Sequence, residues 1–127
     1  MFDLATLLLR FSLGLVMVPH GIYKFQNRPY LDKKWEEEYG FPLGSVVLNG
    51  VVQILGGLAL ILGIYSRYVG AVLLINMLVA LFISIWNHRE PYLSTPKGKG
   101  WDFNVLLVFA LIVQILLGDG SWSLLPS

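Results

Sequence analysis

The sequence predicts an all-α integral membrane protein, an antiparallel bundle of four transmembrane helices that forms one domain over residues 1–127. Composition is the first reason: 56% of the residues are hydrophobic and 13% are charged, against about 45–50% and about 25% in soluble domains. The mean hydropathy of +0.68 agrees with this class. The second reason is that the apolar residues gather in four runs, each long enough to cross about 30 Å of hydrocarbon as a helix.

These runs define the expected membrane spans, because a chain in hydrocarbon must satisfy its backbone hydrogen bonds internally and a helix does so. The spans lie at residues 4–23, 44–66, 68–87 and 101–118. Arg10 is the one charge inside the first span, the second and third carry none, and Asp102 stands at the start of the fourth. The short turn at 66–67 and the link at 88–100 favour antiparallel neighbours.

The connection between the first two spans, "RPYLDKKWEEEYGFP", mixes aromatic and charged side chains and suits the headgroup zone. We expect it to lie along the membrane surface, with a short helix over residues 32–39. Lysine and arginine are unequal on the two sides of the membrane. The larger connections carry Lys24, Arg28, Lys33, Lys34, Arg89, Lys97 and Lys99, whereas the other side carries Arg10 and Arg67. The positive-inside rule therefore places both termini outside the cytoplasm, for a chain in the cell (inner) membrane.

Several functional classes are disfavoured by what the sequence contains. The net charge is +1, so no electrostatic footprint for nucleic acid is expected. There is no cysteine, which removes disulfides, thiolate metal sites and thiol relays. The sequence has neither a metalloprotease HExxH motif nor a nucleophile with a histidine and a carboxylate on one helix face. We expect no metal site, assign no catalytic residue, and do not expect the chain to be an enzyme on its own.

Polar and small residues of the second span fall on one face of the predicted helix. Asn49, Gln53, Gly56, Gly63 and Arg67 lie within about 80° of one another at 100° per residue. The first span repeats the pattern with Arg10, Gly14, Gly21 and Lys24, and Asn104 begins a similar line in the fourth. Such residues are commonly interhelical contacts, with glycine allowing close approach and amides forming hydrogen bonds. A ligand site is the alternative interpretation.

Arg10 needs a partner, because a guanidinium inside a span costs about 2.5 kcal/mol or more. One interpretation is that it extends to the interface or pairs with Asp119. The other is that Arg10 and Arg67, which share one membrane side, form a contact for an anion or a lipid headgroup.

The two histidines end on the opposite membrane side. His20 closes the first span and His88 closes the third, and these helices run parallel in an up-down bundle. We therefore predict a ligand pocket suited to a quinone or another amphipathic redox ligand, formed by His20, Lys24, Asn49, Gln53, His88, Asp102 and Asn104. The alternative is that both histidines are ordinary interfacial residues. A bis-histidine haem is geometrically allowed, but axial ligands normally come from deeper positions.

Two stretches resemble the DoxX-like (DoxX/DoxD) family of small membrane proteins. In "LLLRFSLGLVMVPHGIYKF" the matching positions are Arg10, Gly14, His20, Gly21 and Lys24. In "GFPLGSVVLNGVVQILGGLALILGIYSR" they are Gln53, Gly56, Gly57, Gly63 and Arg67, and Gly57 joins the glycines expected at helix contacts. "LLINMLVALF" and "GDGSWSL" extend the similarity.

The chain departs from that family pattern at two positions. Gln53 stands where relatives often have glutamate, and Asn104 stands near the position of a glutamate that opens the fourth helix of many relatives, with Asp102 two residues earlier. The resemblance therefore implies no proton-carrying role for Gln53, because an amide does not titrate.

The resemblance implies a four-helix inner-membrane protein similar to a subunit of an archaeal quinol oxidase and thiosulfate:quinone oxidoreductase. The function we expect is a small subunit or partner of a quinone-linked membrane oxidoreductase complex. The partners would be membrane lipids and other membrane subunits. The alternative is a purely structural accessory subunit of a larger respiratory or photosynthetic assembly, with its glycine faces turned toward partner helices.

Overall fold

The computed structural model describes the chain except for residues 1, 43, 88, 119, 121 and 127. Its helices are α1 (Phe2–Gln26), α2 (Tyr30–Tyr39), α3 (Ser45–Leu62), α4 (Ser66–Phe82) and α5 (Asp102–Leu117), and α4 continues into a π-helical segment, η1 (Ile83–Asn87). The all-α class is therefore confirmed. By length and composition, Asp3–Gln26, Ser45–Leu62 and Ser66–Trp86 can each cross a membrane, and α5 is a shorter apolar helix.

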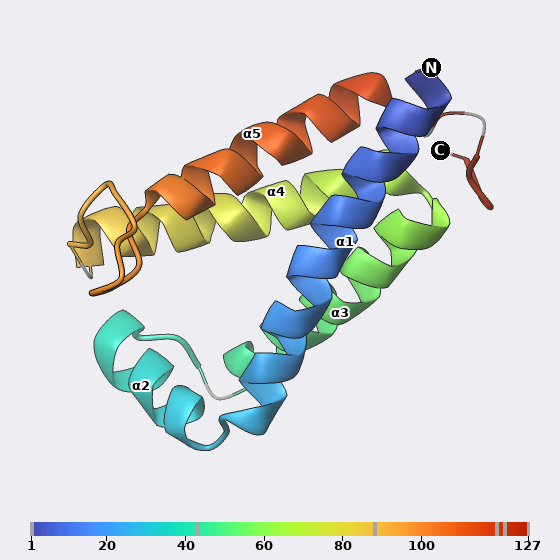
Figure 1. The fold of residues 1–127 in the computed structure, drawn as a ribbon. Coiled ribbons are helices and arrows are strands. Elements are labelled where there is room, and N and C mark those ends of the chain that lie inside the picture. The colour runs from blue at the N-terminus through green and yellow to red at the C-terminus, as the bar shows by residue number, and fades with distance from the viewer. Residues whose placement is uncertain (1, 43, 88, 119, 121, 127) are drawn as a thin grey trace.

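The four long helices form two antiparallel pairs. Figure 1 shows α1 beside α3 and α4 beside α5, with the two pairs meeting near both chain termini and diverging toward α2. The apolar core, which includes Leu13, Leu60, Leu73 and Leu111, joins the two pairs. At the open end, α2 and the connection after α4 face each other across the divergence (Figure 1). The two helix pairs are thus farthest apart at the end of the molecule that carries α2 (Figure 1).

Glycines bring α1 and α3 into close contact. A Cβ on Gly14 would collide with the carbonyl oxygen of Gly57, and one on Gly21 would lie 2.7 Å from the carbonyl oxygen of Gly50. Gly56 instead faces Leu73 of α4, whose Cδ2 would be 3.0 Å from such a Cβ. The expectation that the glycine faces point outward to partner helices is wrong for these residues, because they are used inside the chain.

Gly63 and Arg10 organise the end where the termini lie. Gly63 does not continue the helix as expected; it ends α3 in a left-handed conformation, with φ of 74°. The guanidinium of Arg10 packs against it and donates hydrogen bonds to the carbonyl oxygens of Leu60 at 3.2 Å and Trp122 at 2.6 Å. Arg10 is completely buried, whereas Arg67 is exposed. In the structure Arg10 thus binds backbone carbonyls, and a shared contact of Arg10 and Arg67 with an anion or a lipid headgroup stays a prediction.

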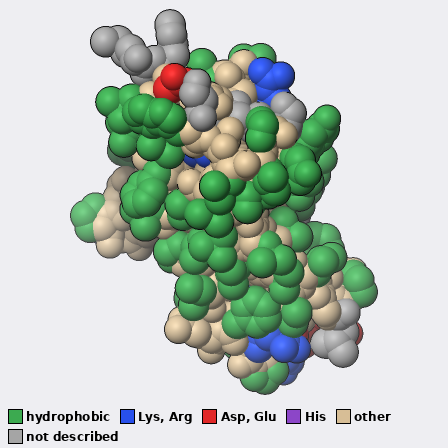
Figure 2. Space-filling view, turned by 90° about the vertical axis from the view of Figure 1, so that its right-hand side faces the viewer, with side chains coloured by type: hydrophobic (Ala, Val, Ile, Leu, Met, Phe, Trp, Pro, Cys, Tyr) green, Lys and Arg blue, Asp and Glu red, His purple; other side chains and the backbone are tan. Residues whose placement is uncertain are grey.

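The outer surfaces of the helices are apolar. Leu8, Leu15, Leu55 and Leu116 are each more than half exposed. In Figure 2 hydrophobic side chains cover most of the visible face, and Lys and Arg side chains are concentrated toward its two ends. This distribution matches a chain whose middle contacts lipid hydrocarbon and whose ends contact headgroups and water.

Candidate ligand-binding site

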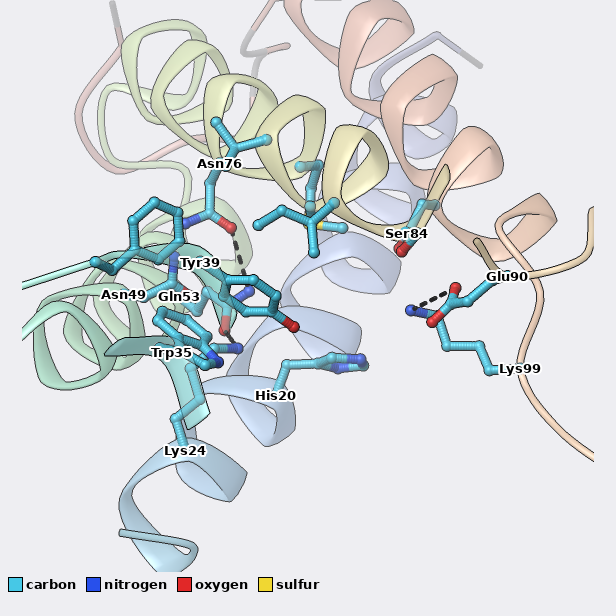
Figure 3. A pocket seen from close by; sticks show the side chains of 16 residues that line it. His20, Lys24, Trp35, Tyr39, Asn49, Gln53, Asn76, Ser84, Glu90 and Lys99 are labelled. Atoms are coloured by element: carbon cyan, nitrogen blue, oxygen red, sulfur yellow. Dashed lines mark hydrogen bonds and ion pairs between the residues drawn. The ribbon is translucent and has the colours of Figure 1, made fainter. Parts of the chain in front are cut away.

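A cavity of about 230 Å³ lies where the helix pairs diverge, and we call it the polar pocket. Elements from along the whole chain contribute to its wall, from α1 to α5 (Figure 3). Its polar lining residues are His20, Lys24, Tyr39, Asn49, Gln53, Asn76, Ser84, Glu90, Lys99 and Asn104. Trp35, Phe41, Met77, Val79, Ala80 and Ile83 complete the wall. Polar groups and aromatic rings together are typical of a small-molecule site.

A chain of hydrogen bonds links three helices along one wall. Lys24 of α1 donates to Oε1 of Gln53 in α3 at 2.6 Å, and Nε2 of Gln53 donates to Oδ1 of Asn76 in α4 at 3.4 Å. Gln53 is only 4% exposed, so this amide is fixed within the packing. An ammonium group has three N–H donors. Lys24 can therefore hold Gln53 and still donate to a ligand.

His20 is oriented by its own helix. Its Nδ1–H donates to the carbonyl oxygen of Val16 at 2.8 Å, since a carbonyl can only accept, and its ring stacks on Phe103 with centroids 5.8 Å apart. In the neutral imidazole the lone pair is then on Nε2. Figure 3 shows the ring extending across the pocket toward the side that holds Glu90 and Lys99. His20 therefore presents a proton acceptor to a bound molecule.

The opposite side of the pocket is formed by η1 and the connection to α5. Lys99 pairs with Glu90 at 3.8 Å, and Asn104 donates to Oγ of Ser84 at 2.8 Å. Ser84 lies in the π-helical segment η1, and π-helical turns are frequent at functional sites. The pocket therefore has Lys24 on one side and the ion pair of Glu90 and Lys99 on the other.

Three aromatic rings cover the pocket from α2. Trp35, Tyr39 and Phe41 form a mutual cluster with centroid distances of 5.7 to 6.2 Å. Gly40, with φ of 71°, reverses the chain after α2 so that Phe41 returns onto Trp35. Burial raises the pKa of Tyr39 to about 12, and the nearby charges of Glu38 and Glu90 act in the same direction. The Tyr39 hydroxyl is therefore protonated at neutral pH and able to donate a hydrogen bond.

The structure brings five of the residues predicted for a ligand pocket to one cavity: His20, Lys24, Asn49, Gln53 and Asn104. His88 lies outside the described residues. Asp102 is not among the lining residues, because its carboxylate accepts hydrogen bonds from Ser94 N at 3.0 Å and Ser94 Oγ at 2.5 Å. Asp102 therefore orders the connection before α5. Ligand binding by the five stays a prediction.

The sequence interpretation did not include the pocket residues Tyr39, Asn76, Ser84, Glu90 and Lys99. For Asn76 a signal exists, since it is an amide in an otherwise apolar span. No sequence signal marks Glu90 and Lys99 as pocket residues, because they belong to a connection whose path depends on how α4 ends. Within the described ranges, no three histidine or acidic side chains gather as metal ligands.

The fold and this cavity define a small multi-pass membrane protein with a polar pocket between two helix pairs. The chain belongs to the DoxX family, whose model matches residues 5–86. It is 25% identical to the uncharacterized protein YdgD of Bacillus subtilis over 93% of this chain and 98% of that one. It is 29% identical to an uncharacterized membrane protein of Mycobacterium tuberculosis, covering 91% and 76% of the two chains.

A third relative is the Bacillus subtilis protein named "Putative oxidoreductase CatD", which is 25% identical over 98% of this chain and 87% of that protein. No solved structure matches the chain.

Proposed function

We propose that this chain is the quinone-binding subunit of a membrane oxidoreductase complex in the cell (inner) membrane. The observation that carries the proposal is the polar pocket itself. It places a lysine, a histidine and a tyrosine hydroxyl around an aromatic-walled cavity in a protein whose outer surface is apolar. The name of the relative CatD, which includes the word oxidoreductase, supports the same class.

The pocket chemistry suits both redox states of a quinone. The two carbonyl oxygens of a quinone accept hydrogen bonds, which Lys24 and the protonated Tyr39 can donate. The hydroxyls of the reduced quinol donate, and Nε2 of His20 can accept. Trp35 and Phe41 offer apolar faces for the ring. Oxidation of the quinol to the quinone releases two protons and two electrons. Nε2 of His20 would take up one proton, water at the pocket mouth would take up the other, and both electrons would pass to the redox group of a partner subunit.

We assign electron transfer to a partner because the chain contains no cysteine and hence no thiol to carry electrons. The partner is a membrane protein with its own redox group. Gentle extraction from native membranes, followed by mass measurement and quinone analysis of whatever co-purifies, tests both parts. Quinone together with a redox subunit is the expected result. A partner of fixed stoichiometry without quinone would instead favour the purely structural accessory subunit.

Binding can be measured directly on the purified chain with a tailless quinone, using quenching of tryptophan fluorescence, since Trp35 lines the pocket. Lys24→Met is expected to weaken binding about 12- to 140-fold, because a hydrogen bond from a charged group contributes about 1.5–3 kcal/mol. Lys33→Met is the matched control, since Lys33 is exposed on α2 and does not line the pocket. No saturable quenching of the wild-type chain would overturn the proposal.

A further inference from the structure

An apolar groove lies between α3 and α4 and begins at the polar pocket. A cavity of about 360 Å³ opens there and shares five lining residues with the polar pocket, namely Trp35, Phe41, Asn49, Asn76 and Val79. Figure 3 shows Trp35, Asn49 and Asn76 together on one side of the pocket, away from Glu90 and Lys99. The polar pocket therefore continues toward the lipid-facing surface between these two helices.

A second cavity, of about 480 Å³, extends the same groove along the helices. It shares Val52 and Val72 with the first and reaches Tyr65 and Tyr68 near the turn between α3 and α4. Gly56 lies in its wall, where a larger residue would press against Leu73. We call the two cavities together the α3–α4 groove. The groove follows the helix direction from the polar pocket toward the other membrane side.

The groove opens on the apolar outer surface of α3 and α4. Leu48, Val72 and Ile75 line it and are 67%, 51% and 64% exposed on the outside of the helices. Asn49 and Asn76, the amides in its wall, lie where it joins the polar pocket. The lining residues are therefore polar in the pocket and mainly apolar along the groove. A molecule with a polar head and a long apolar chain would fit this arrangement.

The size of the polar pocket requires such an exit for a long ligand. An apolar cavity of about 150 Å³ already holds benzene. The polar pocket, at about 230 Å³, can hold a substituted ring but not a chain of isoprenoid units as well. A ligand with a tail can occupy it only if the tail leaves through an opening, and the α3–α4 groove is continuous with it.

We propose that the ligand of the polar pocket is a long-tailed quinone whose isoprenoid chain lies in the α3–α4 groove, and that it moves between pocket and bilayer laterally through this groove. This inference rests on the proposed function. Because lipid chains are as apolar as the groove, moving the tail out of the bilayer gains little free energy by burial. The groove provides space for the tail. Blocking the groove is therefore expected to weaken binding of tailed ligands and not of tailless ones.

The test compares a tailless quinone with one carrying a long isoprenoid chain, both titrated against the purified full chain in lipid nanodiscs. Val72→Trp would fill the groove at the point where its two cavities meet. Val113→Trp is the matched control, because Val113 of α5 is 46% exposed and lines neither groove nor pocket. Since Val72 faces lipid, we expect Val72→Trp to fold like the control, which a thermal unfolding measurement checks.

The expected result is that Val72→Trp weakens binding of the long-tailed quinone about 5- to 140-fold, which corresponds to a steric cost of about 1–3 kcal/mol, and leaves binding of the tailless quinone unaffected. Equal binding of the long-tailed quinone by Val72→Trp and Val113→Trp would overturn the groove assignment while leaving the proposed function standing. Failure of the tailless quinone to bind the wild-type chain would overturn both. A tightly bound phospholipid displaced by Val72→Trp would overturn the quinone as the occupant.

Discussion

Lys24 of α1 donates a 2.6 Å hydrogen bond to Oε1 of Gln53 in α3, inside the wall of the polar pocket. Gln53→Leu removes this acceptor and leaves a partly buried ammonium without it. We expect the free energy of unfolding to fall by about 1–3 kcal/mol, the usual cost of a buried polar group that loses its partner. Thermal unfolding in detergent measures the change.

Two further variants make this prediction specific. Gln26→Leu changes the same residue type at an exposed position at the end of α1 and should have little effect. Gln53→Glu keeps an acceptor for Lys24 and should restore stability to the wild-type level or above. If Gln53→Glu were as destabilising as Gln53→Leu, the hydrogen bond to Lys24 would not be what stabilises this wall.

The close contact of α1 and α3 predicts a strong effect of one added methyl group. Gly14→Ala would place a Cβ against the carbonyl oxygen of Gly57 and 2.5 Å from Cγ1 of Ile61. Because a backbone atom cannot move aside, we expect a loss of about 1–3 kcal/mol of stability, measured by thermal unfolding. Gly98→Ala is the control, since a Cβ there would meet no atom within 4 Å. Equal stability of the two variants would show that the helices can separate without cost.

The raised pKa of Tyr39 predicts a pH dependence of stability. The group is an acid whose pKa is about 12 in the folded chain, against an ordinary value of 10.0 for tyrosine, so the folded chain keeps the proton longer than the unfolded chain. Stability contributed by this difference is present below pH 10 and is lost as the pH rises toward 12. The melting temperature of the wild-type chain should therefore fall between pH 10 and pH 12, and in Tyr39→Phe this fall should be smaller. In Tyr68→Phe, at a 69% exposed position, it should not be.

The distribution of lysine and arginine predicts the orientation in the membrane, and the absence of native cysteine makes it simple to test. Lys97→Cys and Leu124→Cys introduce single thiols at exposed positions on opposite sides. With a membrane-impermeant maleimide on intact cells, Leu124→Cys should be labelled at once and Lys97→Cys only after the membrane is opened. The reverse pattern would place both termini in the cytoplasm.

The parts of the fold that the sequence predicts are those that a single helix determines. Apolar runs predict helices in a membrane because the backbone has no other partner there, and the amide of Gln53 falls on the inner face because its stripe is set by helical phase. Asn104 is found inside for the same reason. The divergence of the two helix pairs, by contrast, depends on packing between them, and no local pattern records it.

The contacts that the sequence does not predict join residues that are distant in the chain. The hydrogen bond from Arg10 to the carbonyl oxygen of Trp122 joins residues 112 positions apart, so the spacing of polar residues within one helix could not predict it. Glu90 and Lys99 enter the pocket because the connection after η1 folds back, held partly by Ser94 and Asp102. Nothing in the spacing of these polar residues distinguishes them from ordinary surface charges.

The hydrogen bond between Arg10 and Trp122 cannot form until nearly the whole chain has been synthesised. The two residues are separated by 112 positions, and the helix that carries Arg10 enters the membrane first. At about 5–20 residues per second, the ribosome needs about 6–22 s to reach the second partner. During that interval a charged group waits in the bilayer without one of its final acceptors. The nascent first helix must therefore be sheltered by water, lipid headgroups or the insertion machinery until the far end of the chain arrives.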